Sequence, residues 1–218
     1  SVEPYVVKGE DGVTDENKRA VRYALGALKG VGEKAMDELV AERNEKGPFK
    51  SIDDFADRVD PRLLNRRQLE SLAAAGAFDD IVADRAAIHE ASETILAVAA
   101  GAMHQRESGQ GGLFGGDVST TPSVQLPNVQ AWTLTERMAR EKDAFGFYFS
   151  AHPVDNYKHL TSANGARTYA EIAVSNVAPG ARRPASMAGL IEGVRWRTSQ
   201  RGKRYAMLSL SDRSGQFV

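Results

Sequence analysis

The sequence has no cysteine among its 218 residues, which excludes disulfide bonds, zinc fingers and thiol catalysis and fits a reducing compartment such as the cytoplasm. It has no apolar run long enough to cross a membrane and no signal segment at its start, so we expect no membrane partner. Neither sign of charge is in excess, because the formal net charge is -1. Any contact with nucleic acid must therefore come from local basic patches.

The sequence contains enough apolar residues for more than one hydrophobic core, since 42% of its residues are hydrophobic and 26% are charged. It begins with Ser1 rather than Met, and its last residues, "SGQFV", are typical of the start of a strand. We therefore expect the chain to be part of a longer protein.

The residue pattern changes several times along the chain and predicts an α+β fold in five parts. These are strands and turns over 1–23, short helices over 24–100, a Gly/Ser/Pro-rich flexible linker over 101–131, a helical connector over 132–183, and an antiparallel hairpin over 184–218.

Capping signals mark several of the expected helices. Ser51 and Thr133 each stand three residues before an acidic residue and predict helix starts, and Gly76 predicts a helix end. The helix expected from Glu33 to Arg43 has one apolar stripe, made of Ala35, Met36, Leu39 and Val40.

The stretch "ALKGVGEKAMDELV" places two glycines around a valine at the start of a helix. A helix-loop-helix with such a loop leaves backbone N–H groups unpaired, and without Cβ atoms a phosphate can approach them closely. The arrangement suits the backbone of DNA, contacted without regard to base sequence. The candidate DNA-binding residues are Lys29, Gly30, Val31, Gly32 and Lys34.

The same glycines also fit an ordinary helical turn in which Gly30 ends one helix. Glu33 counts against a phosphate site, because its carboxylate favours the helix N-terminus but repels an anion unless the side chain turns away.

Period-two alternation in "SMAGLIEGVRWR" and "RYAMLSLSD" predicts two antiparallel strands joined by a basic turn. Basic and aromatic residues together suit single-stranded DNA, by phosphate attraction and base stacking. The candidates are Arg195, Arg197, Arg201, Lys203, Arg204 and Tyr205. The alternative is a structural hairpin with basic residues that only keep an edge soluble. In that case alternation places Trp196 in the core beside Val194, which leaves Tyr205 as the better stacking residue.

The hairpin stretch resembles a helix-hairpin-helix motif, and the following "GPFKSIDDFADRVD" and "LNRRQLESLAAAGAFD" resemble the alpha subunits of bacterial DNA polymerase III, the C-family replicative polymerases. "FGFYFSAHPVDNY" and "VRWRTSQRGKRYAMLSLSDRSG" resemble later parts of those subunits. The resemblance implies a DNA-directed DNA polymerase in which the end of a fingers-like domain (1–23), a tandem helix-hairpin-helix domain (24–100), a clamp-binding segment and the start of an antiparallel OB-fold barrel follow in this order.

Within the expected linker, "QGGLF" is similar to the short peptide by which this family docks on the sliding clamp. Gln110 would supply hydrogen bonds, and Leu113 and Phe114 would fill an apolar pocket with modest affinity. Gly111 and Gly112 depart from the family pattern, since an apolar anchor is missing there. The alternative is that Leu113 and Phe114 pack on the chain's own helices.

We find no catalytic or metal site in the sequence. The adjacent pairs Asp53–Asp54 and Asp79–Asp80 diverge at helix edges and resemble caps. His152, Asp155 and His159 can share a helix face, but a capping and a surface histidine explain them more simply. The catalytic aspartates of the family lie before this region, and Mg²⁺ is expected only for the parent polymerase.

The sequence thus predicts a non-catalytic region of a cytoplasmic, nucleoid-associated polymerase. Its expected partners are double-stranded DNA, single-stranded DNA, the sliding clamp and other replicase subunits. Two alternatives stay open: a free-standing helix-hairpin-helix adaptor of the repair type, and an error-prone paralogue of the same polymerase.

Overall fold

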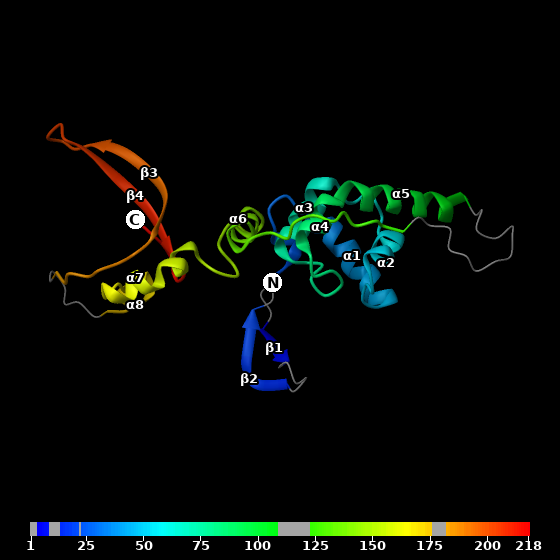
Figure 1. Cartoon of the computed structure of the whole chain (residues 1–218), viewed down its shortest axis with the longest axis horizontal. Helices are drawn as coiled ribbons and strands as arrows, with labels where there is room; N and C mark the ends of the chain where they lie inside the picture. The colour runs from blue at the N-terminus through cyan, green and yellow to red at the C-terminus, as the bar shows by residue number, and fades with distance from the viewer. Residues whose placement is uncertain (1–3, 9–13, 22, 109–122, 176–181) are drawn as a thin grey trace. The chain divides into compact units, whose positions relative to one another are not determined.

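The computed structural model describes residues 4–8, 14–21, 23–108, 123–175 and 182–218. The chain divides into two compact units, which we call the helical unit (Ser1–Phe147) and the sheet unit (Tyr148–Val218). Figure 1 shows the elements of both, and each unit is described by itself. Helices in the first and a small antiparallel sheet in the second confirm the α+β class.

The helical unit opens with an antiparallel pair of strands, β1 and β2, in which Tyr5 lies opposite Ala20. This confirms the strands expected before residue 23. The elements of the unit are β1 (Pro4–Lys8), β2 (Thr14–Val21), the 3-10 turn η1 (Leu25–Ala27), α1 (Glu33–Lys46), α2 (Ile52–Arg58), α3 (Arg66–Ala75), α4 (Arg85–Glu90), α5 (Ser92–Ser108) and α6 (Leu134–Phe145).

The expected helix boundaries are confirmed by cap geometry. Ser51 accepts a hydrogen bond from the Asp54 N–H, Thr133 accepts one from Glu136, and α3 ends at Gly76, whose φ is 80°. A left-handed residue at that position favours glycine.

The buried stripe expected on α1 is partly wrong. Ala35 and Met36 are buried and Leu39 is half-buried, but Val40 is 42% exposed. An apolar stripe inferred from spacing alone is wider than the strip of helix that its neighbours cover.

The core of the helical unit lies among α1 to α6 and the turns between them, with Leu69, Leu72 and Ile95 almost fully buried. The rings of Phe55 and Phe78 meet edge to face at 5.1 Å. Large buried side chains of this kind contribute about 1.5–3 kcal/mol each, so these short helices are stable only together.

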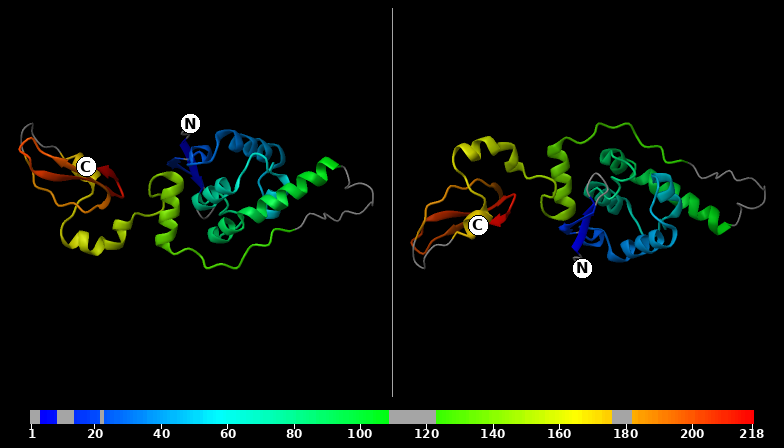
Figure 2. Two further views of the ribbon diagram at one scale, coloured as in Figure 1. Left: turned by 90° about the horizontal axis from the view of Figure 1, so that it is seen from above. Right: turned by 90° about the horizontal axis from the view of Figure 1, so that it is seen from below.

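The expected linker over 101–131 is wrong at both ends. α5 continues to Ser108, and the residues that follow residue 122 lie along the helical unit, as Figure 2 shows. Val124 is buried, and its N–H donates to Asp53 Oδ1 at 2.6 Å. The composition of the stretch hid this attachment, which also includes Leu126 and Trp132 packed against the core and a hydrogen bond from Ser123 Oγ to Asp53.

The helical connector expected over 132–183 is divided between the two units, because α6 belongs to the helical unit. The sheet unit holds the 3-10 helix η3 (Pro153–Tyr157), α7 (Lys158–Ala163), α8 (Tyr169–Ala173), β3 (Leu190–Thr198), β4 (Arg204–Asp212) and β5 (Gly215–Phe217). Its strand order is β3-β4-β5, and β3 carries an irregularity between Ile191 and Gly193.

Buried polar residues join the helices of the sheet unit to its strands. His152 Nδ1 accepts from the Val154 N–H, so Nε2 carries the proton and donates to Ser211 Oγ at 3.0 Å. Ser211 in turn donates to Glu192 at 2.6 Å. This direction of donation is the reverse of what a serine nucleophile requires, so the group is structural.

Asp212 fixes α8 and the β4-β5 turn. Burial opposes its ionisation, but hydrogen bonds from Ser214 and from the N–H groups of Tyr169 and Gly215 outweigh burial and lower the pKa of the Asp212 carboxyl.

Candidate nucleic-acid interface

The glycine hairpin lies between η1 and α1. Lys29, Gly30, Gly32 and Lys34 are all exposed, and Gly30 has a φ of 77°, which favours glycine. Gly32 has an ordinary extended conformation with φ -73°, and a Cβ built on it meets only Gln68 Nε2 at 3.7 Å. Gly30 is therefore required by its backbone conformation, whereas nothing in the fold requires Gly32.

α1 begins differently from its neighbours. In the described part of the helical unit, α2, α3, α4 and α6 each begin with a side chain that accepts a backbone N–H. The N-cap of α1 is Gly32, which has no side chain to do so. The first N–H groups of α1 form a positive helix end without a side-chain cap. Lys34 and Glu33 are both exposed in this first turn, so the Glu33 side chain has to turn away from a bound phosphate.

Val31 and Lys29, two of the candidates from the sequence, use their backbone N–H groups for bonds within the protein. The side chain of Val31 is buried in the core, and its N–H donates to Leu28 O at 3.2 Å. The N–H of Lys29 donates to Ala144 O at 2.9 Å. These two residues hold the hairpin in place with groups that are not open to a phosphate.

Two residues of α3 that lie near the hairpin are not among the candidates predicted from the sequence. Ser71 Oγ donates to Lys29 O at 3.1 Å, and the Gln68 amide lies beside Gly32. No spacing in the sequence signals a contact across 42 residues, so only the structure shows it.

The β3-β4 hairpin carries the second group of candidates. Arg195, Arg197, Arg201, Lys203, Arg204 and Tyr205 are all exposed. No acidic residue occurs from Gly193 to Ser211, so this arm is positive over its whole length.

The expectation that Trp196 packs in the core is wrong. Trp196 is 62% exposed and Val194 is exposed with it. Trp196 lies opposite Ala206 in the register, and the Arg204 guanidinium lies 4.7 Å from the centre of its ring. Tyr205 lies opposite Arg197 on the other face, so each face of the arm presents an aromatic ring with an arginine. The alternation of residues along β3 predicted a buried face, but both faces of the strand are exposed at this end.

The candidate clamp-binding residues Gln110, Leu113 and Phe114 lie outside the described residues.

The paired aspartates match the expected helix caps only in part, since Asp54 accepts from the Lys50 N–H at 2.8 Å at the start of α2. Asp53 holds Val124, Asp54 pairs with Arg58, and Asp79 pairs with Arg85. The N-cap residues of α2 and α4 are Ser51 and Asp84, because the N-cap position precedes the first turn.

The histidines are as expected, since His152 caps η3 and His159 is exposed. Among the described residues, no group of three or more His, Cys, Asp or Glu is placed to hold a metal ion.

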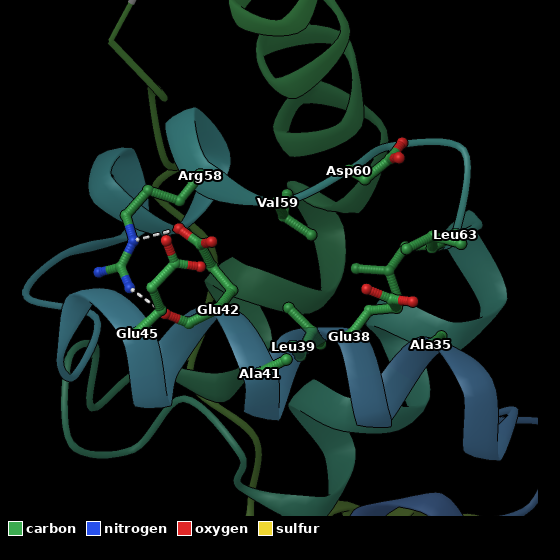
Figure 3. A pocket seen from close by; sticks show the side chains of 11 residues that line it. Ala35, Glu38, Leu39, Ala41, Glu42, Glu45, Arg58, Val59, Asp60 and Leu63 are labelled. Atoms are coloured by element: carbon green, nitrogen blue, oxygen red, sulfur yellow. Dashed lines mark hydrogen bonds and ion pairs between the residues drawn. The ribbon is translucent and has the colours of Figure 1, made fainter.

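A pocket of about 190 Å³ lies between α1 and the segment after α2 (Figure 3). Leu39 and Val59 line it, and Arg58 donates to Glu42 Oε1 at 3.1 Å. Glu38 and Glu45 also line it, so a phosphate is repelled there. This pocket therefore does not extend the candidate phosphate site along α1.

In the parts of the chain that the structure describes, no helix is both long enough and apolar enough to span a membrane.

Comparison with known proteins agrees with the sequence-based resemblance. A family model described as a helix-hairpin-helix motif matches residues 2–88. The DNA polymerase III subunit alpha of Caulobacter vibrioides is 38% identical over 197 residues, which is 90% of this chain and 17% of that protein. Those of Deinococcus radiodurans and Pseudomonas aeruginosa are 36% and 33% identical over 90% and 99% of this chain.

The chain spans 17%, 15% and 19% of the length of these three relatives. The similarity extends over nearly all of this chain and includes the helix-hairpin-helix motif as well as residues beyond it. The chain is therefore homologous to a segment of the DNA polymerase III alpha subunits.

Proposed function

We propose that this chain is the DNA-binding and sliding-clamp-binding region of a replicative DNA polymerase III alpha subunit, and that it supports processive, template-directed DNA synthesis. The observation that carries the proposal is the start of α1, where exposed Gly32 leaves backbone N–H groups without a side-chain cap inside a helix-hairpin-helix match.

The chemistry of that end suits a phosphodiester. Backbone N–H groups and the positive end of the helix attract an anion, and the absence of a Cβ at Gly32 lets a phosphate approach closely. Lys34 adds charge beside it. None of these groups distinguishes one base from another, so the hairpin binds duplex DNA of any sequence.

The test is the substitution Gly32→Ala. Its Cβ meets no atom closer than 3.7 Å, so the fold tolerates it, but it occupies the place of the phosphate. We expect weaker binding to a short duplex by fluorescence anisotropy at low salt. Gly101→Ala is the matched control, because Gly101 is exposed on α5 and its added Cβ meets no atom within 4 Å. Equal duplex affinity for G32A and the parent overturns the phosphate site.

The basic arm of the sheet unit adds a second contact, to single-stranded DNA. Its arginines and Lys203 attract phosphates, and Trp196 and Tyr205 offer faces on which bases stack. Single-strand binding by part of an antiparallel barrel is typical of OB-folds.

Binding to the sliding clamp rests on Gln110, Leu113 and Phe114 alone. Their similarity to the clamp-docking peptide of the family is what supports this part of the proposal. A pull-down with a bacterial sliding clamp tests this part, and clamp binding would favour the replicative subunit over an error-prone paralogue of the same polymerase.

The polymerase reaction belongs to the longer protein. Nucleotidyl transfer needs carboxylates that hold two Mg²⁺ ions against a triphosphate, and we assign no residue of this chain to them. The names of the relatives favour a polymerase over a free-standing adaptor. Within the parent, this region would contact other replicase subunits in the cytoplasm.

A further inference from the structure

The glycine hairpin is held from two sides at Lys29. The N–H of Lys29 donates to Ala144 O at 2.9 Å, and its carbonyl accepts from Ser71 Oγ at 3.1 Å. Lys29 directly precedes Gly30, whose φ of 77° sets the direction of the chain into α1. The two hydrogen bonds therefore fix the backbone from which Gly30 and Gly32 follow.

One of these two bonds depends on where α6 lies. α6 is held by Glu141, a fully buried carboxylate one turn before Ala144. Glu141 Oε1 accepts from Arg85 Nη1 at 3.0 Å and from Arg137 Nε at 3.1 Å. A buried carboxylate is stable only with such partners, so Glu141 ties α6 to Arg85.

Arg85 is itself fixed to the rest of the helical unit. It donates twice to Asp79, at 2.8 and 2.6 Å, and once to Ala74 O at 3.1 Å. Hydrogen bonds thus join the end of α3 to Arg85 and Arg85 to Glu141. The backbone of α6 connects Glu141 to Ala144, whose carbonyl accepts from the Lys29 N–H. α6 lies outside the helix-hairpin-helix match, which ends at residue 88.

We propose that Glu141 and Ser71 are positioning residues for duplex DNA: they hold Lys29 so that the backbone after it presents the start of α1 to a phosphate. The duplex-binding surface is then a product of two distant parts of the chain, and the helix-hairpin-helix motif alone does not suffice. This inference rests on the proposed function of the glycine hairpin.

The substitution Glu141→Gln tests it in the full 218-residue chain. Arg85 keeps Asp79 and Ala74 O, so no buried cation is left without partners. E141Q also removes a negative charge, which by electrostatics alone strengthens binding to DNA. A loss of duplex affinity therefore has to come from the position of the hairpin.

Glu42→Gln is the matched control. Glu42 is half-buried and accepts from Arg58 at 3.1 Å, so E42Q also weakens an ion pair and removes one negative charge. It lies ten residues along α1 from Gly32, away from the start of the helix. Ser71→Ala is the second variant, which changes no charge and removes only the bond to Lys29 O.

We expect E141Q to weaken binding to a short duplex by roughly three- to tenfold and to speed hydrogen exchange at the Lys29 amide. S71A should weaken duplex binding by a smaller factor, and E42Q should change neither quantity. The measurements are fluorescence anisotropy and amide exchange resolved by residue.

Duplex affinity like the parent's in E141Q, with G32A still defective, overturns this inference and leaves the proposed function standing. An equal loss in E42Q overturns it as well, because the effect then follows stability rather than position. If E141Q does not fold, parent-like binding by S71A overturns it. A parent chain that does not bind duplex DNA overturns the proposed function and this inference together.

Discussion

The Arg204 guanidinium lies over the ring of Trp196, 4.7 Å from its centre, on an arm of β-hairpin whose side chains are exposed on both faces. The Arg204 guanidinium covers one face of the Trp196 indole, and a base can stack on the other face. We therefore predict that Trp196→Ala weakens binding to an oligothymidine roughly tenfold, in line with the stacking of one base. Anisotropy titrations at several salt concentrations measure it.

Met207→Ala is the control for that prediction, because Met207 is also exposed and faces the opposite side of the arm. In a Trp132→Phe background, quenching of Trp196 fluorescence by the oligonucleotide reports contact directly, since the chain has two tryptophans. No quenching, or equal affinity of W196A and the parent, contradicts the stacking role.

Changing Leu113 and Phe114 together to Ala should abolish binding to the sliding clamp and leave duplex binding unchanged, because these side chains would fill an apolar pocket on the clamp. Surface plasmon resonance on immobilised clamp measures the first quantity and anisotropy the second. A drop in the melting temperature of the double variant would instead favour packing of these residues on the chain's own helices.

Asp53→Ala should release the segment that follows residue 122. Its carboxylate accepts from the Val124 N–H at 2.6 Å, and removing a charged acceptor costs about 1.5–3 kcal/mol. Hydrogen exchange at Val124 should become faster in D53A than in Asp57→Ala, which changes an exposed carboxylate of the same helix. Equal exchange in the two variants would show that burial of Val124 alone holds the segment.

His152→Ala should destabilise the sheet unit by about 1–3 kcal/mol, because η3 loses its cap and Ser211 loses a donor in a buried place. Amide exchange in β4, read separately from the helical unit, measures this. His159→Ala is the control, since His159 is exposed. If amide exchange in β4 is equally fast in both variants, the hydrogen bonds of His152 do not stabilise the sheet unit.

The stability of the helical unit should fall as the pH drops below about 6.5. Burial, and then the charge of Arg140, lower the pKa of His89 from its ordinary value of 6.5. Below pH 6.5, His89 binds a proton more readily in the unfolded chain than in the folded chain. The free energy of unfolding is therefore full above pH 6.5 and decreases as the pH falls toward the lower pKa of the folded state. Urea unfolding between pH 7.5 and 5 measures the loss, and His89→Gln should reduce it. The same loss in H89Q would point to another group.

The sequence by itself determined most of the local structure. The caps at Ser51 and Thr133, the stop at Gly76 and the strands around the basic turn all follow from interactions within a few residues, which a short stretch of sequence specifies. The resemblance to the polymerase subunits likewise needed only the order of the motifs.

Only the tertiary structure decided what covers each side chain. Trp196 is exposed and Val124 is buried, both against expectation, because burial depends on which distant segment packs there and composition does not encode that. For the same reason the hairpin's supports, Ser71 and Ala144, stand far from Lys29 in the chain. The glycines permit a phosphate to approach, but long-range hydrogen bonds determine where the backbone N–H groups lie.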